Sequence, residues 1–435
     1  MNTRNEIGVS GRKRGAVLLG AVASGLIVLW VAWWVQSIRR DSLLFGEHTW
    51  VLPLKFLAGD FKVHIDHVTR IQASGVNPYF VKDDPICATF PYPPMIPRLF
   101  AWVTWFTPAQ AAAIWQGALA LFLAIAAYAA WRARRELGLC PVPLTVIIAA
   151  LIYSTPALMA MERGQCDPLV IPAILVVSWL ARSGGTRKQL VAGGLLGVTA
   201  WLKYYPGFAV FGLLALRRWK AAAAFVVVAG LIGVFDRAEV RRSIDNGKSF
   251  ALEARKAPFV SPVTHSIASN WKAIPIVRHF RPLRKIPPMV AAAVLLLPVT
   301  LVVSLKVARS RNPSPSLAPY LLWMTAVATF GMPYAIDYNL VSLPLVALFV
   351  WDRRDPVIVH VAMGMLLFWW QPIAINVGGE ILLFAKLTAL YAVGFCLTRR
   401  AEEASQAALI ENVYRAIGRV DQPGSTHQYA QPYTA

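Results

Sequence analysis

AVLLGAVASGLIVLWVAWWV, residues 16–35, is an unbroken run of uncharged residues. At about 1.5 Å per residue, a helix of this length crosses a hydrocarbon core about 30 Å thick. Basic residues precede the run, and its tryptophan-rich end leads into Arg39 and Arg40 instead of a small-residue cleavage site. We therefore predict an uncleaved first membrane span with the N-terminus in the cytoplasm.

The composition excludes the ordinary soluble classes of protein. Of the 435 residues, 57% are hydrophobic and only 15% are charged, whereas soluble chains contain about 25% charged residues. A net charge of +21 would suggest nucleic-acid binding in a soluble chain, but the positive-inside rule explains it in a membrane protein. The four cysteines show no CxxC spacing, so we expect neither a zinc module nor a disulfide-stapled ectodomain.

Further apolar stretches bring the expected number of spans to about twelve. They lie near residues 109–131, 143–159, 168–181, 189–202, 206–216, 221–235, 288–305, 317–334, 340–350, 357–370 and 379–398. Every second connection between them is basic, as in Arg132/Arg134/Arg135 and Arg353/Arg354. This alternation predicts an all-α polytopic membrane protein with one transmembrane domain over residues 1–398.

The same alternation assigns sides to the longer segments. Residues 36–108 and 236–287 form two long extracytoplasmic loops, and the tail 399–435 lies in the cytoplasm with a helix over 402–417 before a disordered end. Segment 95–106 is apolar for only about a dozen residues and contains Arg98. Such a segment suits an interfacial helix on the outer surface better than a span.

The outer loops and outer helix ends carry the candidate site residues. Asp60, in Gly59-Asp60-Phe61, is either a general base toward a hydroxyl or a solvated loop carboxylate. Lys203, between two apolar segments, either snorkels or binds an anion such as a lipid phosphate. The charges within residues 162–168 fit either an ordinary turn or the binding of a polar substrate.

Several other ionisable residues have open roles. His64 and His67 share a helix face but have no third partner at a telling spacing, so we expect no metal site. Asp337 lies at another outer helix end, and Lys386 lies inside the last span, where a charge indicates a functional site or a structural ion pair. Because no nucleotide-binding motif appears, energy would come from an activated lipid or an ion gradient.

The order of short motifs resembles glycosyltransferase family 87, in the GT-C superfamily of polyprenyl-phosphate-sugar-dependent glycosyltransferases. In chain order the motifs are Gly59-Asp60-Phe61, Asn77-Pro78-Tyr79, Tyr92-Pro93-Pro94, Gly164-Gln165 and Leu202-Lys203 with Tyr205-Pro206. They span roughly residues 55 to 210, and their order and outer placement together are more specific than any one of them. The second half of the chain is similar only in hydropathy.

This resemblance implies a GT-C fold in the bacterial plasma membrane and an active site on the extracytoplasmic side. A sugar, first of all mannose, would pass with inversion from a polyprenyl phosphate to a lipid or glycan acceptor. Asp60 would be the catalytic base, and Lys203 would contact the donor phosphate. Further substrate contacts would come from Tyr92, Arg163, Gln165, Asn77, Tyr79 and His265. The implied partners are membrane lipids, donor and acceptor, with no nucleic acid, cofactor or metal.

Three alternatives stay open. Asp66 is a rival base, because relatives often carry a tyrosine-rich stretch where this chain has residues 63–67. Arabinofuranose is the alternative to mannose as the transferred sugar, because GT-C relatives use both sugars. A secondary transporter would also have about twelve spans, but its ionisable residues would gather near the bilayer midplane. In this sequence the notable polar residues gather at outer helix ends, which favours the enzyme.

Overall fold

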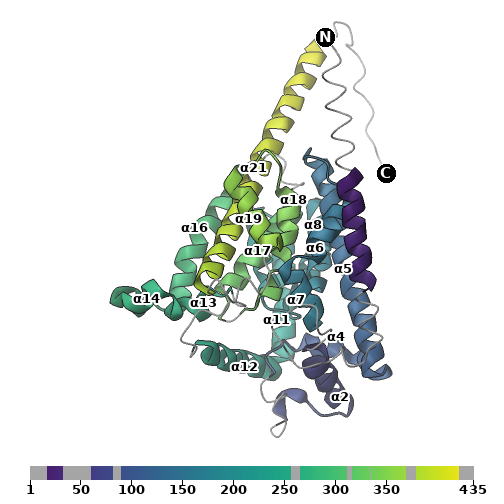
Figure 1. The fold of residues 1–435 in the computed structure, drawn as a ribbon, viewed down its shortest axis with the longest axis vertical. Helices are drawn as coiled ribbons and strands as arrows, with labels where there is room; N and C mark the ends of the chain where they lie inside the picture. The colour runs from purple at the N-terminus through teal and green to yellow at the C-terminus, as the bar shows by residue number, and fades with distance from the viewer. Residues whose placement is uncertain are drawn as a thin grey trace.

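The computed structural model describes residues 17–32, 60–81, 90–255, 265–310, 316–333, 335–368 and 379–420. These residues are predominantly helical and contain no β-strand, which confirms the all-α class. Their order along the chain is apparent in Figure 1, from the purple helix over residues 17–32 to the yellow helix near the C-terminus.

The longer helices coincide with the apolar stretches of the sequence. They are α5 (Pro108–Glu136), α6 (Leu144–Ile152), α7 (Thr155–Arg163), α8 (Asp167–Arg182), α9 (Thr186–Ala200), α10 (Ala209–Ala215), α11 (Trp219–Phe235), α16 (Pro288–Arg309), α17 (Leu317–Gly331), α18 (Ser342–Val350), α19 (Val357–Phe368) and α21 (Gly379–Val420). The polar helix α12 (Arg237–Arg255) follows α11.

Shorter helices occupy the connections. They are η1 (Phe61–Asp66), α2 (His67–Ala73), η2 (Pro78–Phe80), α4 (Met95–Leu99), η3 (Ala101–Trp105), η4 (Tyr205–Phe208), α13 (Ile267–Asn270), η5 (Trp271–Ala273), α14 (Pro275–His279), α15 (Arg281–Lys285) and η6 (Asp337–Leu340). Most of them fall in the two segments predicted to be long loops.

Three of the described helices are long and apolar enough to cross a membrane, namely α5, α16 and residues Ile381–Gln406 of α21. Two bent pairs raise the number to five: α6 meets α7 at 62°, and α11 meets α12 at 92°. The structure therefore supports a membrane protein with three to five candidate spans. Twelve crossings remain a prediction.

The bundle has two chemically different ends (Figure 1). Helices α2, α4 and α12 lie at one end, which we call the loop end. At the other, the basic end, Arg134 donates to the carbonyl oxygen of Trp351, Arg218 donates to that of Arg182, and Arg400 pairs with Asp355. Basic connections far apart in the sequence thus meet at one end. Which end faces the cytoplasm stays a prediction of the charge pattern.

Two segments differ in detail from the sequence prediction. Residues 95–106 do not form one interfacial helix, because the chain leaves the α conformation at Phe100, whose ring packs edge-on to Trp115 at 4.5 Å. The last span and the tail helix are one continuous helix, α21. No proline occurs in α21, and Arg399 pairs with Glu403 one turn later.

Helices α9 and α11 approach each other closely through small residues. A Cβ atom added at Gly193 would lie 2.0 Å from the carbonyl oxygen of Ala221, whereas one added at Gly194 would meet nothing nearer than 3.7 Å. Small residues permit such backbone contact between helices in membranes.

We predict that Gly193→Ala lowers the stability of the protein by roughly 2 kcal/mol, because the added methyl group must push the helices apart. Gly194→Ala should leave stability unchanged or slightly raised, since alanine favours helix over glycine. Thermal unfolding of both variants in the same detergent compares them directly. Equal unfolding temperatures would contradict the close α9–α11 contact.

Candidate functional site

The loop end contains a buried cluster of charged and polar side chains from separate parts of the chain. Asp60 precedes η1, Arg163 ends α7, Gln165 stands just before α8, and Lys203 precedes η4. Gly164, which ends α7, adopts the left-handed conformation with φ of 65°. Glycine takes this conformation without steric cost, so the chain can reverse between Arg163 and Gln165 and direct both toward Asp60.

Asp60 is the carboxylate of this cluster and is only 7% exposed. Arg163 Nη1 donates to Asp60 Oδ1 at 2.7 Å, and Gln165 Nε2 donates to Asp60 Oδ2 at 2.7 Å. Gln165 Nε2 also donates to the Tyr92 hydroxyl at 2.9 Å. A carboxylate offers about four acceptor positions, so these two donors leave capacity for a hydroxyl donor from a substrate.

Lys203 is the second cation of the cluster and is buried. Its Nζ donates to Gln165 Oε1 at 3.1 Å, lies 3.4 Å from Asp167 Oδ2, and sits 4.8 Å from the centre of the Tyr92 ring. Burial by itself disfavours the ammonium form, but Asp167 and other neighbours outweigh it and hold the pKa of Lys203 above its ordinary value. Lys203 is therefore a fixed positive charge at neutral pH.

Tyr92 keeps its proton beside these charges. Its burial raises the pKa of the phenol to about 12. Helix α12 holds the two residues that precede Tyr92. Ser243 Oγ donates to the Pro91 carbonyl oxygen, and Asn246 Nδ2 donates to the Phe90 carbonyl oxygen, both at 2.9 Å. The first predicted loop is thus held in place by the second.

Asp167 is a central residue whose role the sequence did not reveal. It is fully buried, and its Oδ1 accepts from the Tyr205 hydroxyl and from Asn339 Nδ2, both at 2.7 Å. The carboxylate therefore joins α8, η4 and η6, which are distant in sequence. Two features of the sequence could have indicated this role. An aspartate at the start of an apolar helix needs polar partners at membrane depth, and Tyr205 lies in a motif that also contains Lys203.

Asn77 and Tyr79 support the cluster from the side. Asn77 Oδ1 accepts from the Tyr79 amide at 3.1 Å and starts η2, and the Tyr79 hydroxyl donates to the Tyr92 carbonyl oxygen at 2.8 Å. His265 is also buried, with Nε2 2.9 Å from Thr329 Oγ1 on α17. The structure thus brings Tyr92, Arg163, Gln165 and Lys203 together with Asp60, links Tyr79 to Tyr92 and packs His265 against α17.

The other ionisable residues have different surroundings. Asp66 pairs with Arg70 one turn later, at 2.8 Å, so this ion pair is local to its own helix. Lys386 is fully buried in α21. The side chains of His64 and Asp337 lie outside the described residues. Among the described residues, no group of three or more His, Cys, Asp or Glu side chains could hold a metal ion.

The apolar helices and the candidate spans are those of a membrane protein, and a buried charged cluster lies at one end of it. The model of glycosyltransferase family 87 matches residues 90–236, about a third of the chain. The match confirms the resemblance to this family, and with it the assignment of the protein to the glycosyltransferases. Tyr92, Arg163, Gln165 and Lys203 lie inside the matched segment, whereas Asp60 precedes it. No curated protein and no solved structure matches the chain.

We predict that Asp167→Asn lowers the free energy of unfolding by roughly 3 kcal/mol, because removing one partner of a buried ion pair leaves the Lys203 charge uncompensated. The matched control is Asp245→Asn, which changes an exposed carboxylate paired with Lys248 and should cost less than about 1 kcal/mol. Denaturant or thermal unfolding in detergent tests both. An Asp167→Asn variant as stable as the control would contradict the structural role of the carboxylate.

Proposed function

We propose that this protein transfers a sugar, mannose, from a polyprenyl phosphate to a lipid or glycan acceptor at the extracytoplasmic face of the membrane, with inversion. The observation that carries the proposal is the buried Asp60 carboxylate, which pairs with Arg163 and is connected to Lys203 through the side chain of Gln165. The reaction requires a general base, which activates the attacking hydroxyl, and positive charge, which stabilises the departing phosphate. The cluster contains one carboxylate that can be the base and two cations.

In this reaction Asp60 accepts the proton of the acceptor hydroxyl. The hydroxyl oxygen forms a bond to the anomeric carbon on the face opposite the phosphate, and the carbon–oxygen bond to the phosphate breaks with its electron pair. Polyprenyl phosphate leaves, and the configuration at the anomeric carbon is inverted. Because Arg163 and Gln165 hold both carboxylate oxygens, the base is oriented before the acceptor arrives.

The phosphate of the donor is the natural ligand for Lys203. With Asp60 and Asp167 opposing Arg163 and Lys203, the cluster is balanced in formal charge. A phosphate that approached Lys203 would replace its 3.4 Å contact with Asp167 by a closer one. The positive charge is then available to the leaving group when its negative charge grows.

The exposed aromatic side chains that follow Lys203 in the sequence suit a polyprenyl chain. Phe208, at the end of η4, and Phe211, on α10, are 47% and 54% exposed, and their ring centroids lie 5.8 Å apart. Exposed aromatic side chains on apolar helices offer contacts to a lipid tail. The extracytoplasmic location rests on the basic residues that gather at the opposite end of the bundle.

Arabinofuranose in place of mannose would leave this mechanism unchanged, since the proposed base acts on the acceptor hydroxyl and the proposed cations act on the phosphate, whichever sugar is transferred. A secondary transporter is the alternative from another class. The buried Lys386 within α21 is the observation that favours it, but the connected cluster at the loop end favours the transferase.

We predict that Asp60→Asn lowers transfer by at least about a hundredfold, because an amide cannot accept the proton. The assay follows radiolabelled mannose from synthetic polyprenyl-phosphomannose into a membrane lipid extract with the purified protein. Asp66→Asn is the matched control in the same loop and should lower transfer less than Asp60→Asn does. Equal activity of Asp60→Asn and the unaltered protein would remove Asp60 as the base. Transfer only from an arabinofuranose donor would change the sugar and keep the mechanism.

We predict that Lys203→Met raises the apparent KM for the donor or lowers kcat strongly, because the phosphate loses its counter-charge. The single change also leaves Asp167 buried without the ammonium, so Lys203→Met combined with Asp167→Asn separates misfolding from the loss of phosphate binding. Lys248→Met, at an exposed lysine of α12, is the control. Unchanged donor kinetics in the folded double variant would show that Lys203 does not serve the phosphate.

A further inference from the structure

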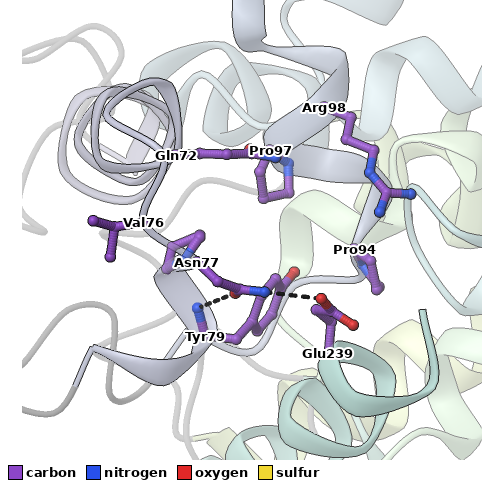
Figure 2. Close-up of a pocket in the computed structure, with 10 residues that line it drawn as sticks. Gln72, Val76, Asn77, Tyr79, Pro94, Pro97, Arg98 and Glu239 are labelled. Atoms are coloured by element: carbon purple, nitrogen blue, oxygen red, sulfur yellow. Dashed lines mark hydrogen bonds between the residues drawn. The ribbon is translucent and has the colours of Figure 1, made fainter.

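A second polar site lies at the loop end, beside the cluster rather than within it. Figure 2 shows a pocket between the turn after α2, α4 and the first turn of α12. Its volume is about 240 Å³. Its polar side chains are those of Gln72, Asn77, Tyr79, Arg98 and Glu239. Pro78, Pro94 and Pro97 supply flat apolar faces.

Strong polar contacts hold the walls of this pocket. Arg98 donates to both oxygens of Asp236 at 2.6 Å, at the 92° bend between α11 and α12. Asn77 Nδ2 donates to Glu239 Oε1 at 2.8 Å across the pocket (Figure 2). Bidentate and charge-assisted bonds of this kind fix geometry as well as adding energy. The pocket is therefore preformed.

The charges of the pocket select against an anion. The guanidinium of Arg98 is already held by both oxygens of Asp236, which offsets its attraction for an anion, and the Glu239 carboxylate also lines the pocket. The hydrogen bond from Asn77 occupies Oε1 of Glu239 and leaves further acceptor capacity on this carboxylate. Carboxylate oxygens suit hydroxyl donors, and they would repel a phosphate.

The pocket is connected to the cluster through two tyrosines. Tyr79 forms part of the pocket wall, and its hydroxyl donates to the carbonyl oxygen of Tyr92. The Tyr92 hydroxyl contacts Gln165, which in turn holds Asp60. The pocket is thus linked to the proposed base through Tyr79, Tyr92 and Gln165.

We propose that this pocket binds a neutral, hydroxyl-rich unit of the acceptor, a sugar or a polyol, adjacent to the unit whose hydroxyl reacts at Asp60. The proposal rests on the proposed function, because it names the class of acceptor. Vicinal hydroxyls of this unit would donate to Glu239 and accept from Asn77 or Arg98. The apolar C–H face of its ring would pack on the prolines.

The test measures binding separately from transfer. The full chain in lipid nanodiscs is titrated with methyl α-mannopyranoside, with myo-inositol and with inorganic phosphate, and saturation-transfer NMR detects each ligand. We expect at least one hydroxylated probe to bind to the unaltered protein and to bind about tenfold more weakly to Glu239→Ala, since hydrogen bonds to a charged group are lost. Glu239→Gln, which preserves an acceptor for Asn77, should be intermediate.

The control is Asp245→Asn, on the same helix and outside the pocket, which should bind as the unaltered protein does. Binding of neither hydroxylated probe, or binding that Glu239→Ala leaves unchanged, would overturn the proposal. Phosphate binding that depends on Glu239 would also overturn it. If the hydroxylated probe binds through Glu239 but no polyprenyl-phosphate sugar is turned over, the pocket stands and the proposed donor chemistry fails.

The transfer assay adds a second readout where turnover is measured. Glu239→Ala should raise the apparent KM for an alkyl mannoside acceptor by more than it lowers kcat, because the pocket binds a unit remote from the reacting hydroxyl. A purely structural role for Glu239 would lower stability and kcat together, with no selective change in the acceptor KM.

Discussion

The side chain of Gln165 connects the two charges on which the proposed chemistry depends. Its Nε2 donates to the carboxylate of Asp60, and its Oε1 accepts from the ammonium of Lys203. An amide has both a donor and an acceptor at one end of a short chain, so it can hold a carboxylate and an ammonium near each other without letting them neutralise each other directly. The remaining arrangement at the loop end serves to keep this amide, and the groups it touches, in place.

Buried charges are costly unless each has a partner, and this constraint explains how the surrounding helices meet. Arg163 compensates Asp60, and Asp167 compensates Lys203 while also drawing Tyr205 and Asn339 inward. Segments from widely separated parts of the chain therefore converge on one small volume. The same groups that stabilise the loop end form the candidate site, so structure and proposed activity depend on one network.

Much of the fold is readable from the sequence because it depends on local chemistry. The apolar stretches are helical, although residues 143–159 and 206–216 are each divided between two helices. The grouping of Arg134, Arg218 and Arg400 at one end follows the alternation of basic connections. The motifs also identified Asp60, Gln165 and Lys203, but their contacts depend on how helices pack, which no spacing encodes. In the sequence, Asp167 is one of three charged residues within residues 162–168 and is not distinguished from the other two. Its partners Tyr205 and Asn339 are far away in the sequence, so only the structure reveals its role. The break at Phe100 was likewise invisible, since it reflects aromatic packing on Trp115 and not the local hydropathy.

The bend between α11 and α12 relates the two sites to each other. Asp236, at the bend, holds Arg98 of the first predicted loop, and α12 then places Glu239 in the pocket and Ser243 against the segment that leads to Tyr92. One polar helix, α12, therefore shapes the proposed acceptor pocket and supports the proposed donor cluster. A transferase must bring two substrates together in a defined geometry before reaction. Because both sites contact a single helix, the hydrogen bonds that α12 makes with each of them fix their separation.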